Sequence, residues 1–358
     1  MILFGYILKE FFKVFFIILF SMTSIFWIGD FFANMGSFLK SDATFIVIVK
    51  YFLFKTPIAF YYIIPFAVLA SSMYFFGKLN ANYEMIAFRT LKVDKLVFYR
   101  ILSGIGVIFY LLLLINNEIL IPKSFYMSKV LKNVYFKKRS NFAVYEADKI
   151  WYKKGNYIFK IDFANFDRGF MRGITLFRFN NNFDLIERID AFIGIYSKNK
   201  WTLKEVEINV FNKDMSVKRE FKEKYDLPVQ IDRDDFVAIS TESKYLTLNQ
   251  TLNIVKSLKA TSIDTVKYKT ELINKIVYPF ICVVFLFFGF ILNLRNPRER
   301  GGVASIIYSV VLGFVILFLQ NFFINLGYAK IIPFFAAPLI TFIIAFFIFI
   351  FLNKKISY

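Results

Sequence analysis

The sequence contains no histidine and a single cysteine, Cys282. Without histidine, the chain cannot form a Ser-His-Asp triad, a Cys-His catalytic pair or a histidine-ligated metal site. A lone cysteine cannot form an internal disulfide, so any domain outside the membrane is held together by packing. The phosphate-binding motif G-x-x-x-x-G-K-[ST] is also absent. These absences predict a protein that is not an enzyme and has no cofactor or metal.

Acidic residues are scarce: 26 Asp and Glu stand against 45 Lys and Arg, which gives a formal charge of +19. A basic surplus can indicate nucleic acid binding, but no DNA- or RNA-binding motif accompanies it here. Carboxylates such as Asp162, Asp167, Asp190 and those of residues 232–235 are interspersed with lysines and arginines, which is typical of solvated surface charge. We therefore expect no nucleic acid partner and interpret the surplus as charge beside a membrane.

Long apolar runs are abundant. Hydrophobic residues make up 58% of the chain, with 50 Phe and 21 Tyr. Six runs exceed the roughly 20 apolar residues that cross a ~30 Å hydrocarbon core, and a soluble domain would not repeat such runs. They extend over residues 11–33, 45–77, 97–122, 273–293, 303–326 and 331–352. The fold class we predict is an α-helical membrane bundle of six transmembrane helices, three on each side of an inserted all-β domain.

The predicted domains follow from this layout. Residues 1–122 hold transmembrane helices one to three, with a short connecting helix at 83–91. Residues 123–270 form the extramembrane β-domain with a helical return, and residues 271–358 hold helices four to six. In the return, Thr247 is expected to cap a helix that ends at Lys259, and Ser262 to cap a second helix that enters span four, where Pro279 introduces a kink.

The inserted block carries the alternation of β-strands. Between residues 142 and 229, aromatic or β-branched residues alternate with polar ones, and turn residues interrupt them at 155–156, 180–182, 198–200 and 212–214. This pattern is typical of an antiparallel β-sandwich or jelly roll, whose interior we expect to include Trp151, Tyr157, Phe159, Phe177 and Phe179. Such a domain can hold lipid chains, pair with another β-domain through a sheet edge, or serve as a spacer.

Basic residues gather beside alternate ends of the spans. The opposite connections hold little beyond Lys40 with Asp42, and Lys330. The positive-inside rule therefore predicts cytoplasmic termini and an external β-domain. The residues on the predicted cytoplasmic side are Lys9, Lys13, Lys78, Arg89, Lys92, Lys95, Arg100, Arg295, Arg298, Arg300, Lys354 and Lys355.

Polar residues at membrane depth are costly and therefore informative. Asp30 lies near the outer end of span one, and Asn116, Asn117 and Glu118 lie near the outer end of span three. One interpretation is a polar wall that faces a cavity in the outer half of the bundle. The alternatives are hydrogen bonding between helices and side chains that reach to the interface.

The connection between spans two and three predicts a short amphipathic helix, because Met85, Phe88 and Arg89 stand at positions i, i+3 and i+4. It can lie on the membrane surface or dock into a groove on a soluble partner. Docking would supply the energy source of a permease that lacks an ATPase motif. Glu84 suits the positive end of this helix and can pair with a basic residue of the partner; the alternative is a solvated capping carboxylate.

The order and spacing of several motifs resemble the LptF/LptG (YjgP/YjgQ) family of lipopolysaccharide export permeases. No single motif is diagnostic, but the likeness covers almost the entire chain. The motifs are Gly-Tyr-Ile-Leu-Lys before span one, Thr56-Pro57 and Ile64-Pro65 in span two, Tyr83-Glu84-Met85, Glu118 followed by Pro122, residues 150–156, and Lys275 with Pro279.

The resemblance implies a multi-pass, non-catalytic permease subunit of an ABC transporter in the bacterial inner membrane. It implies a paired permease (LptF-like), a cytoplasmic ATPase dimer (LptB-like) and periplasmic jelly-roll partners (LptC/LptA-like), with lipopolysaccharide as cargo. Glu84 corresponds to the coupling glutamate of the family, and the Trp151 region resembles the LptG branch. The rival interpretations are a permease for another envelope lipid and a membrane-anchored sensor or scaffold.

For lipid binding, the resemblance points to Lys129 and Lys132, which match basic residues of the family pattern, with Lys123 one or two helical turns earlier. Lysine ammonium groups can hold lipid A phosphates, or they can anchor the helix at the membrane boundary. Lys40 and Glu118 complete the expected lipid-binding residues.

Two departures from the family pattern have structural consequences. The outer end of span one reads Gly-Asp-Phe-Phe over residues 29–32, where the family carries lysines, so phosphate contact from this helix is not expected. Lys92 stands where the family usually has glycine, which predicts a different C-terminal cap for the connecting helix.

Overall fold

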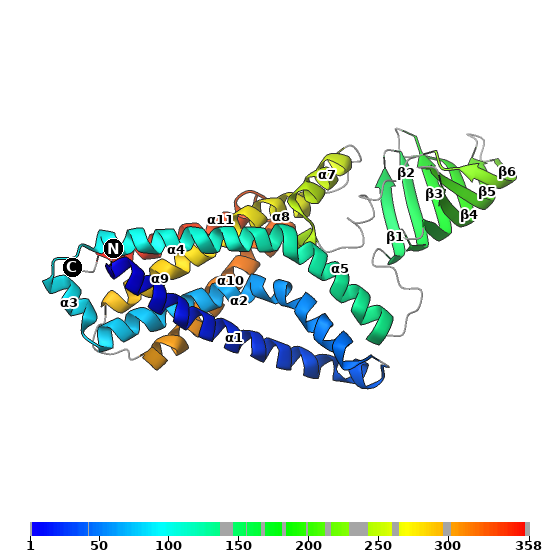
Figure 1. Ribbon diagram of the computed structural model, residues 1–358. Coiled ribbons are helices and arrows are strands. Elements are labelled where there is room, and N and C mark those ends of the chain that lie inside the picture. Colours follow the sequence, from blue (N-terminus) through cyan, green and yellow to red (C-terminus); the bar gives the residue numbers. More distant parts are fainter. Residues whose placement is uncertain are drawn as a thin grey trace. The chain divides into compact units, whose positions relative to one another are not determined.

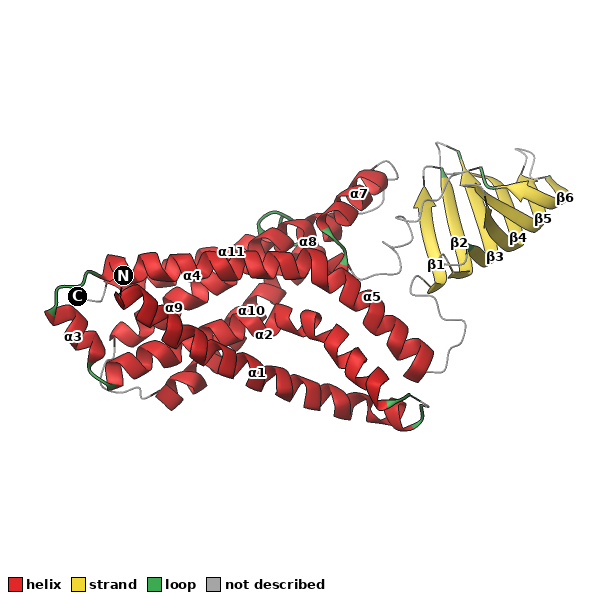
Figure 2. Cartoon of the chain, in the orientation of Figure 1, coloured by secondary structure: helices red, strands yellow, loops and turns green. Residues whose placement is uncertain are grey.

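The computed structural model describes residues 2–354 apart from 42, 137–145, 155, 166–168, 181–183, 198–199, 212–215, 229–242, 260–264 and 296–301. The chain divides into two compact units, one of Met1–Ser128 with Thr270–Tyr358 and one of Lys129–Lys269. The first unit is helical, and the second contains the strands (Figure 2).

Among the described residues, six helical segments are long and apolar enough to cross a membrane, which confirms the predicted spans. The third and fourth segments each contain a short break in the α-helix. The helical segments are α1 (Ile2–Leu39), α2 (Phe45–Ala81), α4 (Lys95–Ile115) continued by the π-helix η1 (Asn116–Leu120) and α5 (Ile121–Leu131), α8 (Val266–Val277) continued by the 3₁₀-helix η4 (Tyr278–Phe280) and α9 (Ile281–Arg295), α10 (Gly302–Tyr328) and α11 (Ala337–Lys354).

The prolines explain two local features of the bundle. Pro279 lies in η4, so the α-helix of span four is interrupted at the position where the sequence predicts a kink. In α2, Pro65 lacks the N–H that would bond to the carbonyl of Tyr61, four residues earlier. The hydroxyl of Tyr278 donates to that carbonyl instead, at 3.1 Å. A break in one helix therefore supplies the donor that a proline removes from another.

Helices α2 and α9 form the centre of the bundle. The most apolar window of α2 is 67% buried and that of the segment from α8 to α9 is 61% buried, against 22% for α1 and α11. Ser72 of α2 donates to the carbonyl of Leu286 at 2.9 Å. A Cβ on Gly289 would lie 2.2 Å from the Ser72 hydroxyl oxygen, so glycine is required at this crossing. The peripheral helices therefore expose broad apolar faces on the surface of the chain.

The connection between α2 and α4 forms the predicted short helix, α3 (Glu84–Thr90). Figure 1 shows α3, the start of α1 and the end of α11 at the same end of the helical unit. The expected change of C-terminal cap is wrong. Lys92 adopts the left-handed conformation (φ 54°), and the N–H of Val93 bonds to the Phe88 carbonyl at 3.0 Å, as in a glycine-type cap. The hydrogen bonds of the cap outweigh the strain of a lysine in that conformation.

Six strands form one antiparallel sheet in chain order, which confirms the inserted β-domain. Lys154 pairs with Tyr157 and Ser197 with Lys200, so the hairpins expected at 155–156 and 198–200 are present. The described strands form this sheet alone, and a jelly roll stays a prediction. The strands are β1 (Glu146–Lys154), β2 (Tyr157–Asn165), β3 (Phe170–Phe179), β4 (Leu185–Ser197), β5 (Lys200–Phe211) and β6 (Val217–Asp226).

The interior of the sheet differs in part from the prediction. Phe159 is fully buried and Tyr157 packs against the same core, as expected. Phe177 lies instead beside Arg188, whose guanidinium is 5.8 Å from the ring centroid, and Phe179 is half-buried. Trp201 is 4% exposed and was missed. Trp151 lies in β1, but its side chain is outside what the structure describes.

The face of Phe177 changes because strict alternation fails within β3. Met171, Ile174 and Leu176 are buried, so two residues separate the first pair and one separates the second. The shift occurs at Gly173, whose φ is +63°. A Cβ there would lie 2.5 Å from a carboxylate oxygen of Asp162. A local bend at this glycine therefore moves Phe177 to the other face.

The helical return begins as predicted. Helix α7 (Leu248–Lys259) is capped by Thr247, whose hydroxyl accepts from the N–H of Gln250 at 3.1 Å. The Gln250 side chain accepts from the N–H of Thr247 at 2.9 Å, which completes a capping box. The expected cap at Ser262 lies outside the described residues.

Candidate functional site

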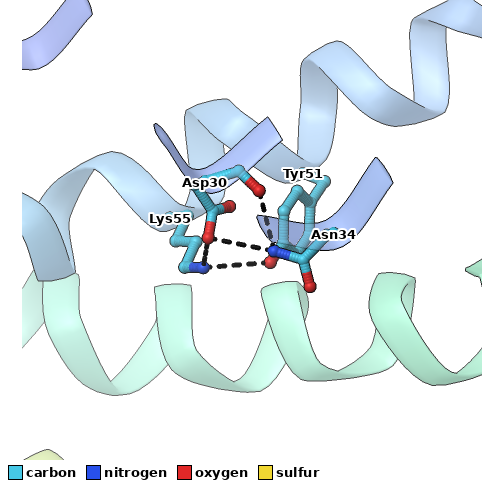
Figure 3. Close-up of polar contacts among 4 residues, drawn as sticks. All are labelled: Asp30, Asn34, Tyr51 and Lys55. Atoms are coloured by element: carbon cyan, nitrogen blue, oxygen red, sulfur yellow. Dashed lines mark hydrogen bonds and ion pairs between the residues drawn. The ribbon is translucent and has the colours of Figure 1, made fainter. Parts of the chain in front are cut away.

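Four polar side chains converge between α1 and α2 (Figure 3). Asp30 and Asn34 lie one turn apart on α1, and Tyr51 and Lys55 lie one turn apart on α2, so each pair occupies one helix face. The Lys55 ammonium forms an ion pair with Asp30 and donates to the Tyr51 hydroxyl at 3.1 Å. Nearby, Trp27 donates to the Thr56 hydroxyl at 3.0 Å. These contacts fix the register of α1 against α2.

The two carboxylate oxygens of Asp30 differ in their hydrogen bonds. Its Oδ1 accepts from Lys55 and from the Asn34 amide at 3.1 Å. Its Oδ2 is buried and has no hydrogen-bond partner among the described residues. An unsatisfied buried acceptor costs about 1–3 kcal/mol, and more when it is charged.

The level of this cluster follows from the helix lengths. Asp30 lies nine residues before the end of α1, and Lys55 lies ten residues after the start of α2. At 1.5 Å per residue, both are about 15 Å from the α1–α2 connection. Helix α1 has 38 residues and is about 57 Å long, so it exceeds a ~30 Å hydrocarbon core. Asp30 thus lies near the end of the first apolar run, and Lys55 lies inside the second.

A second polar cluster lies inside the bundle, among span three, α8, α10 and the start of α11. Lys275 is 1% exposed; its ammonium donates to Asn117 at 3.5 Å and is attracted by Glu271 and Glu118. Glu271 accepts from the Tyr328 hydroxyl at 2.5 Å. The cluster is completed by Gln320, which donates to Asn274 at 3.4 Å and to the Pro338 carbonyl at 3.2 Å.

The polar residues predicted at membrane depth contact other helices. Asn116 donates to the Pro57 carbonyl at 2.9 Å, Asn117 accepts from Lys275, and Asp30 pairs with Lys55. Hydrogen bonding between helices, one of the predicted alternatives, accounts for all three. Glu118 is half-buried and has an electrostatic interaction with Lys275.

The remaining predicted lysines lie apart from these clusters in sequence. Lys40 directly follows α1 and is exposed. Lys123 is exposed on α5. Lys129 is in the last turn of α5 and Lys132 begins the π-helix η2 (Lys132–Phe136); both are half-buried. They therefore follow one another along one continuous helical segment, as the sequence predicts.

In α3, the carboxylate of Glu84 accepts from the Tyr6 hydroxyl at 2.7 Å and from the Asn82 amide at 3.3 Å. Tyr6 belongs to the first turns of α1, so these contacts join α3 to that helix. The Glu84 side chain remains partly exposed. The helix thus presents an acidic group that is positioned by the protein but still open to a partner.

The apolar face of α3 is divided differently from the prediction. Met85 is 2% exposed in the bundle core, and Phe88 packs against the same core, with its ring 5.8 Å from that of Phe98. Both therefore face the bundle in this structure. The exposed apolar residues are Tyr83, Ile86 and Leu91. The side chain of Arg89 is outside what the structure describes.

Sequence reasoning missed the partners of both polar clusters. Lys55 and Tyr51 lie inside the second apolar run, and a lysine within such a run is itself a signal of a functional or paired group. Tyr328 and Gln320 lie within or directly after the fifth run. Their partners are distant in sequence, so no spacing rule connects them.

The comparison with protein families gives one match. The family model described as lipopolysaccharide export system permease LptF/LptG matches residues 5–355. The match covers both polar clusters, α3 and the sheet, so the chain belongs to this family. A search among curated proteins gives no match.

Proposed function

From the membership of this chain in the LptF/LptG family of lipopolysaccharide export permeases, we propose that it extracts lipopolysaccharide from the inner membrane and passes it to a periplasmic jelly-roll bridge. The observation that carries the proposal is a family match over nearly the whole chain, on a bundle of six apolar helices with an inserted sheet. The members of this family are permease subunits, and ATP hydrolysis belongs to a separate partner.

The orientation we propose places both termini and α3 in the cytoplasm and the sheet in the periplasm. The basic residues beside alternate ends of the spans support this orientation. The common location of α3 and the chain ends at one end of the bundle supports it as well (Figure 1). The ion pair of Asp30 and Lys55 then lies near the outer leaflet.

Docking to the ATPase falls to α3 in this proposal. Glu84 supplies the charge for this contact. Met85 and Phe88 pack against the bundle, so the exposed side chains of Tyr83, Ile86 and Leu91 supply the apolar contact with the ATPase instead. An acidic group near a helix N-terminus is stabilised by the helix dipole and can form a charge-assisted hydrogen bond with an arginine or lysine of the partner.

A second permease would cover the peripheral helices. The most apolar windows of α1 and α10 are 22% and 28% buried within the chain. Phe16, Phe20, Phe314 and Phe318 are exposed along these helices. Van der Waals packing between transmembrane helices needs such continuous faces, although lipid covers them equally well in a single chain. The Trp151 region supports the LptG branch for this chain, with an LptF-like partner.

In the periplasm, we propose that the β-domain receives acyl chains or extends a neighbouring jelly roll. The sheet has β1 and β6 at its two edges among the described strands. Strand β6 is exposed along almost its entire length and alternates basic, acidic and aromatic residues. An unpaired edge can add the strand of another β-domain, and its charges select the partner.

We expect the double variant Lys129→Glu, Lys132→Glu to reduce photocrosslinking of lipopolysaccharide by at least about thirtyfold. Each lysine supplies roughly 1 kcal/mol of attraction to lipid phosphate, and reversal of the charge adds repulsion. Lys123→Glu on the same helical segment and Lys40→Glu beyond α1 test the two other lysines, and Glu118→Gln tests the expected carboxylate. Lys200→Glu, in an exposed position of β5, is the matched control. Unchanged crosslinking would assign Lys129 and Lys132 to membrane anchoring.

The whole proposal is tested by purification of the tagged chain from its native membranes. We expect an ABC ATPase and a second permease to co-purify, and lipopolysaccharide to stimulate ATP hydrolysis by the complex. A chain that purifies without any nucleotide-binding subunit would favour a sensor or scaffold. Stimulation by another envelope lipid in place of lipopolysaccharide would assign a different cargo and would still support the permease function.

A further inference from the structure

An apolar groove lies on the surface of the helical unit, between α11 and the segment that joins η4 to α9, and it reaches α4 at one end. Its volume is about 560 Å³, and ligand pockets typically measure roughly 300–1,000 Å³. Phe288 and Ala345 are buried in the groove, whereas Phe280 and Phe346 are exposed along it. Apart from Tyr99, every residue that lines the groove is Val, Leu, Ala or Phe. The groove is therefore suited to a hydrocarbon ligand.

Short side chains on two neighbouring helices create this groove. Between residues 342 and 352 of α11, Ala345 is the only residue that is not Phe, Ile or Leu. Val283 and Val284 lie across from it on α9, in a helix that is otherwise rich in phenylalanine. Helices in a packed bundle normally fill the space between them with side chains. These three short side chains leave a space that a molecule from the membrane can fill.

The length of the groove matches one lipid chain. On α11 the groove extends from Leu339 to Phe349, which are ten residues apart. At 1.5 Å per residue this distance is about 15 Å. One leaflet is half of a ~30 Å hydrocarbon core and therefore also measures about 15 Å. A single acyl chain of one leaflet thus has the length to lie in the groove.

Hydrogen-bond donors stand at the α4 end of the groove. The Tyr99 hydroxyl donates to the side-chain oxygen of Asn353 at 3.1 Å, and Asn353 is the last residue but one of α11. Because that oxygen accepts, the amide nitrogen of Asn353 remains a donor. Lys95 lies four residues before Tyr99 on the same face of α4. The adjacent carboxylate of Asp94 caps α4 by accepting from the N–H of Leu96 at 3.1 Å.

We propose that the groove binds one acyl chain of an anionic phospholipid of the cytoplasmic leaflet, and that Lys95 and Asn353 contact its phosphate. Basic residues between helices on the cytoplasmic side attract anionic head groups, so the charge of Lys95 complements this lipid. The leaflet follows from the orientation proposed above, in which the ends of α1 and α11 near α3 are cytoplasmic. The site is separate from both polar clusters and from the cargo. The bound chain fills the space between α9 and α11 and stabilises their packing.

The affinity of the full-length chain for phospholipid tests the site, measured by native mass spectrometry during titration with phosphatidylglycerol or phosphatidylcholine. We expect Lys95→Gln to bind phosphatidylglycerol about fivefold more weakly than the wild type, which corresponds to about 1 kcal/mol, and to leave phosphatidylcholine unchanged. Ala345→Phe fills the groove, so we expect it to weaken the binding of both lipids by at least about tenfold.

Two matched variants control for charge and for volume. Lys13→Gln removes an exposed lysine of α1, from a residue within the first turns of that helix. Ile343→Phe places a ring on α11 at a position that is 52% exposed and does not line the groove. We expect wild-type affinity for phosphatidylglycerol from both. Equal affinity of Ala345→Phe and Ile343→Phe would overturn the groove as a lipid site, and equal affinity of Lys95→Gln and Lys13→Gln would overturn the contact with phosphate.

Photolabelling of the unaltered protein tests the site without any substitution. Phosphatidylglycerol with a diazirine at the end of one acyl chain should label Val277, Phe280 or Leu339, at the far end of the groove. The same lipid with the diazirine beside the ester should label Tyr99 or Phe349. Excess unlabelled phosphatidylglycerol should remove both labels. Labels scattered over the exposed faces of α1 and α10 would overturn the site.

Two further results would assign the groove to another occupant and overturn the proposal. Displacement of the photolabel by lipopolysaccharide, but not by phosphatidylglycerol, would make the groove part of the cargo path. Loss of a co-purifying membrane subunit from Ala345→Phe, with unchanged affinity for phosphatidylglycerol, would make it a contact for a partner helix. The phospholipid measurements do not require export, so the site can fail or stand independently of the proposed function.

Discussion

Glu84→Lys is expected to abolish lipopolysaccharide export while the protein remains inserted and folded. The side chain is partly exposed on α3, so the change costs little folding free energy, roughly 1 kcal/mol or less. The reversed charge at the helix N-terminus repels both the helix dipole and a basic residue of the ATPase. Export is measured by lipopolysaccharide at the cell surface in cells that depend on the variant, and coupling by the amount of ATPase that co-purifies.

Tyr6→Phe separates the two roles of Glu84. It removes the hydrogen bond between the Tyr6 hydroxyl and the carboxylate but leaves the carboxylate in place. We expect near-normal export from this variant, because a single exposed hydrogen bond contributes about 1 kcal/mol. Normal export by Glu84→Lys would remove the coupling role. Equal loss in Tyr6→Phe and Glu84→Lys would instead assign Glu84 to the junction between α1 and α3.

The largest loss of stability is expected from Lys275→Met. The ammonium of Lys275 is buried beside Glu271 and Glu118. Its removal leaves the two carboxylates that attract it without a nearby cation, and an uncompensated buried charge of this kind typically costs about 3–5 kcal/mol. Unfolding of the purified protein in detergent, followed against temperature or denaturing detergent, measures the change.

Two further variants make the stability prediction specific. In Lys275→Met with Glu271→Gln, one of the two uncompensated charges is gone, so we expect part of the lost stability to return. Lys354→Met removes an exposed lysine at the end of α11 and should leave stability within about 0.5 kcal/mol of the wild type. A Lys275→Met protein as stable as Lys354→Met would show that the buried cluster contributes no net stability.

Part of the candidate site could be predicted from the sequence. The other part could not, because it depends on pairs of residues that are far apart in the chain. Asp30 and Glu84 were predicted because a carboxylate in an apolar run, or at the start of a short helix, stands out locally. The partners Lys55 and Tyr6 lie 25 and 78 residues away from them, and only the packing of α1 against α2 and α3 brings them into contact. A single sequence contains no signal for such a pairing.

Local signals also failed where tertiary packing competes with them. The spacing of Met85 and Phe88 on α3 correctly predicts an amphipathic helix, but it does not say whether the apolar face meets the bundle or a partner. The alternation in β3 predicts an interior Phe177, and the bend at Gly173 reverses its face. A glycine-type cap forms at Lys92 because the hydrogen bonds at the end of α3 compensate for the strain.

The sequence by itself determined the six membrane spans, the inserted β-domain, its hairpins and the helix interruption at Pro279, because apolar length, alternation and turn chemistry are properties of neighbouring residues. Tertiary structure alone decided which polar groups pair inside the bundle and which faces remain open. In a hydrocarbon environment an unpaired polar group is costly, so polar groups pair with one another, and which groups pair depends on which helices approach closely. Asp30 of α1 therefore pairs with Lys55 of α2, a contact that depends on the packing of the two helices.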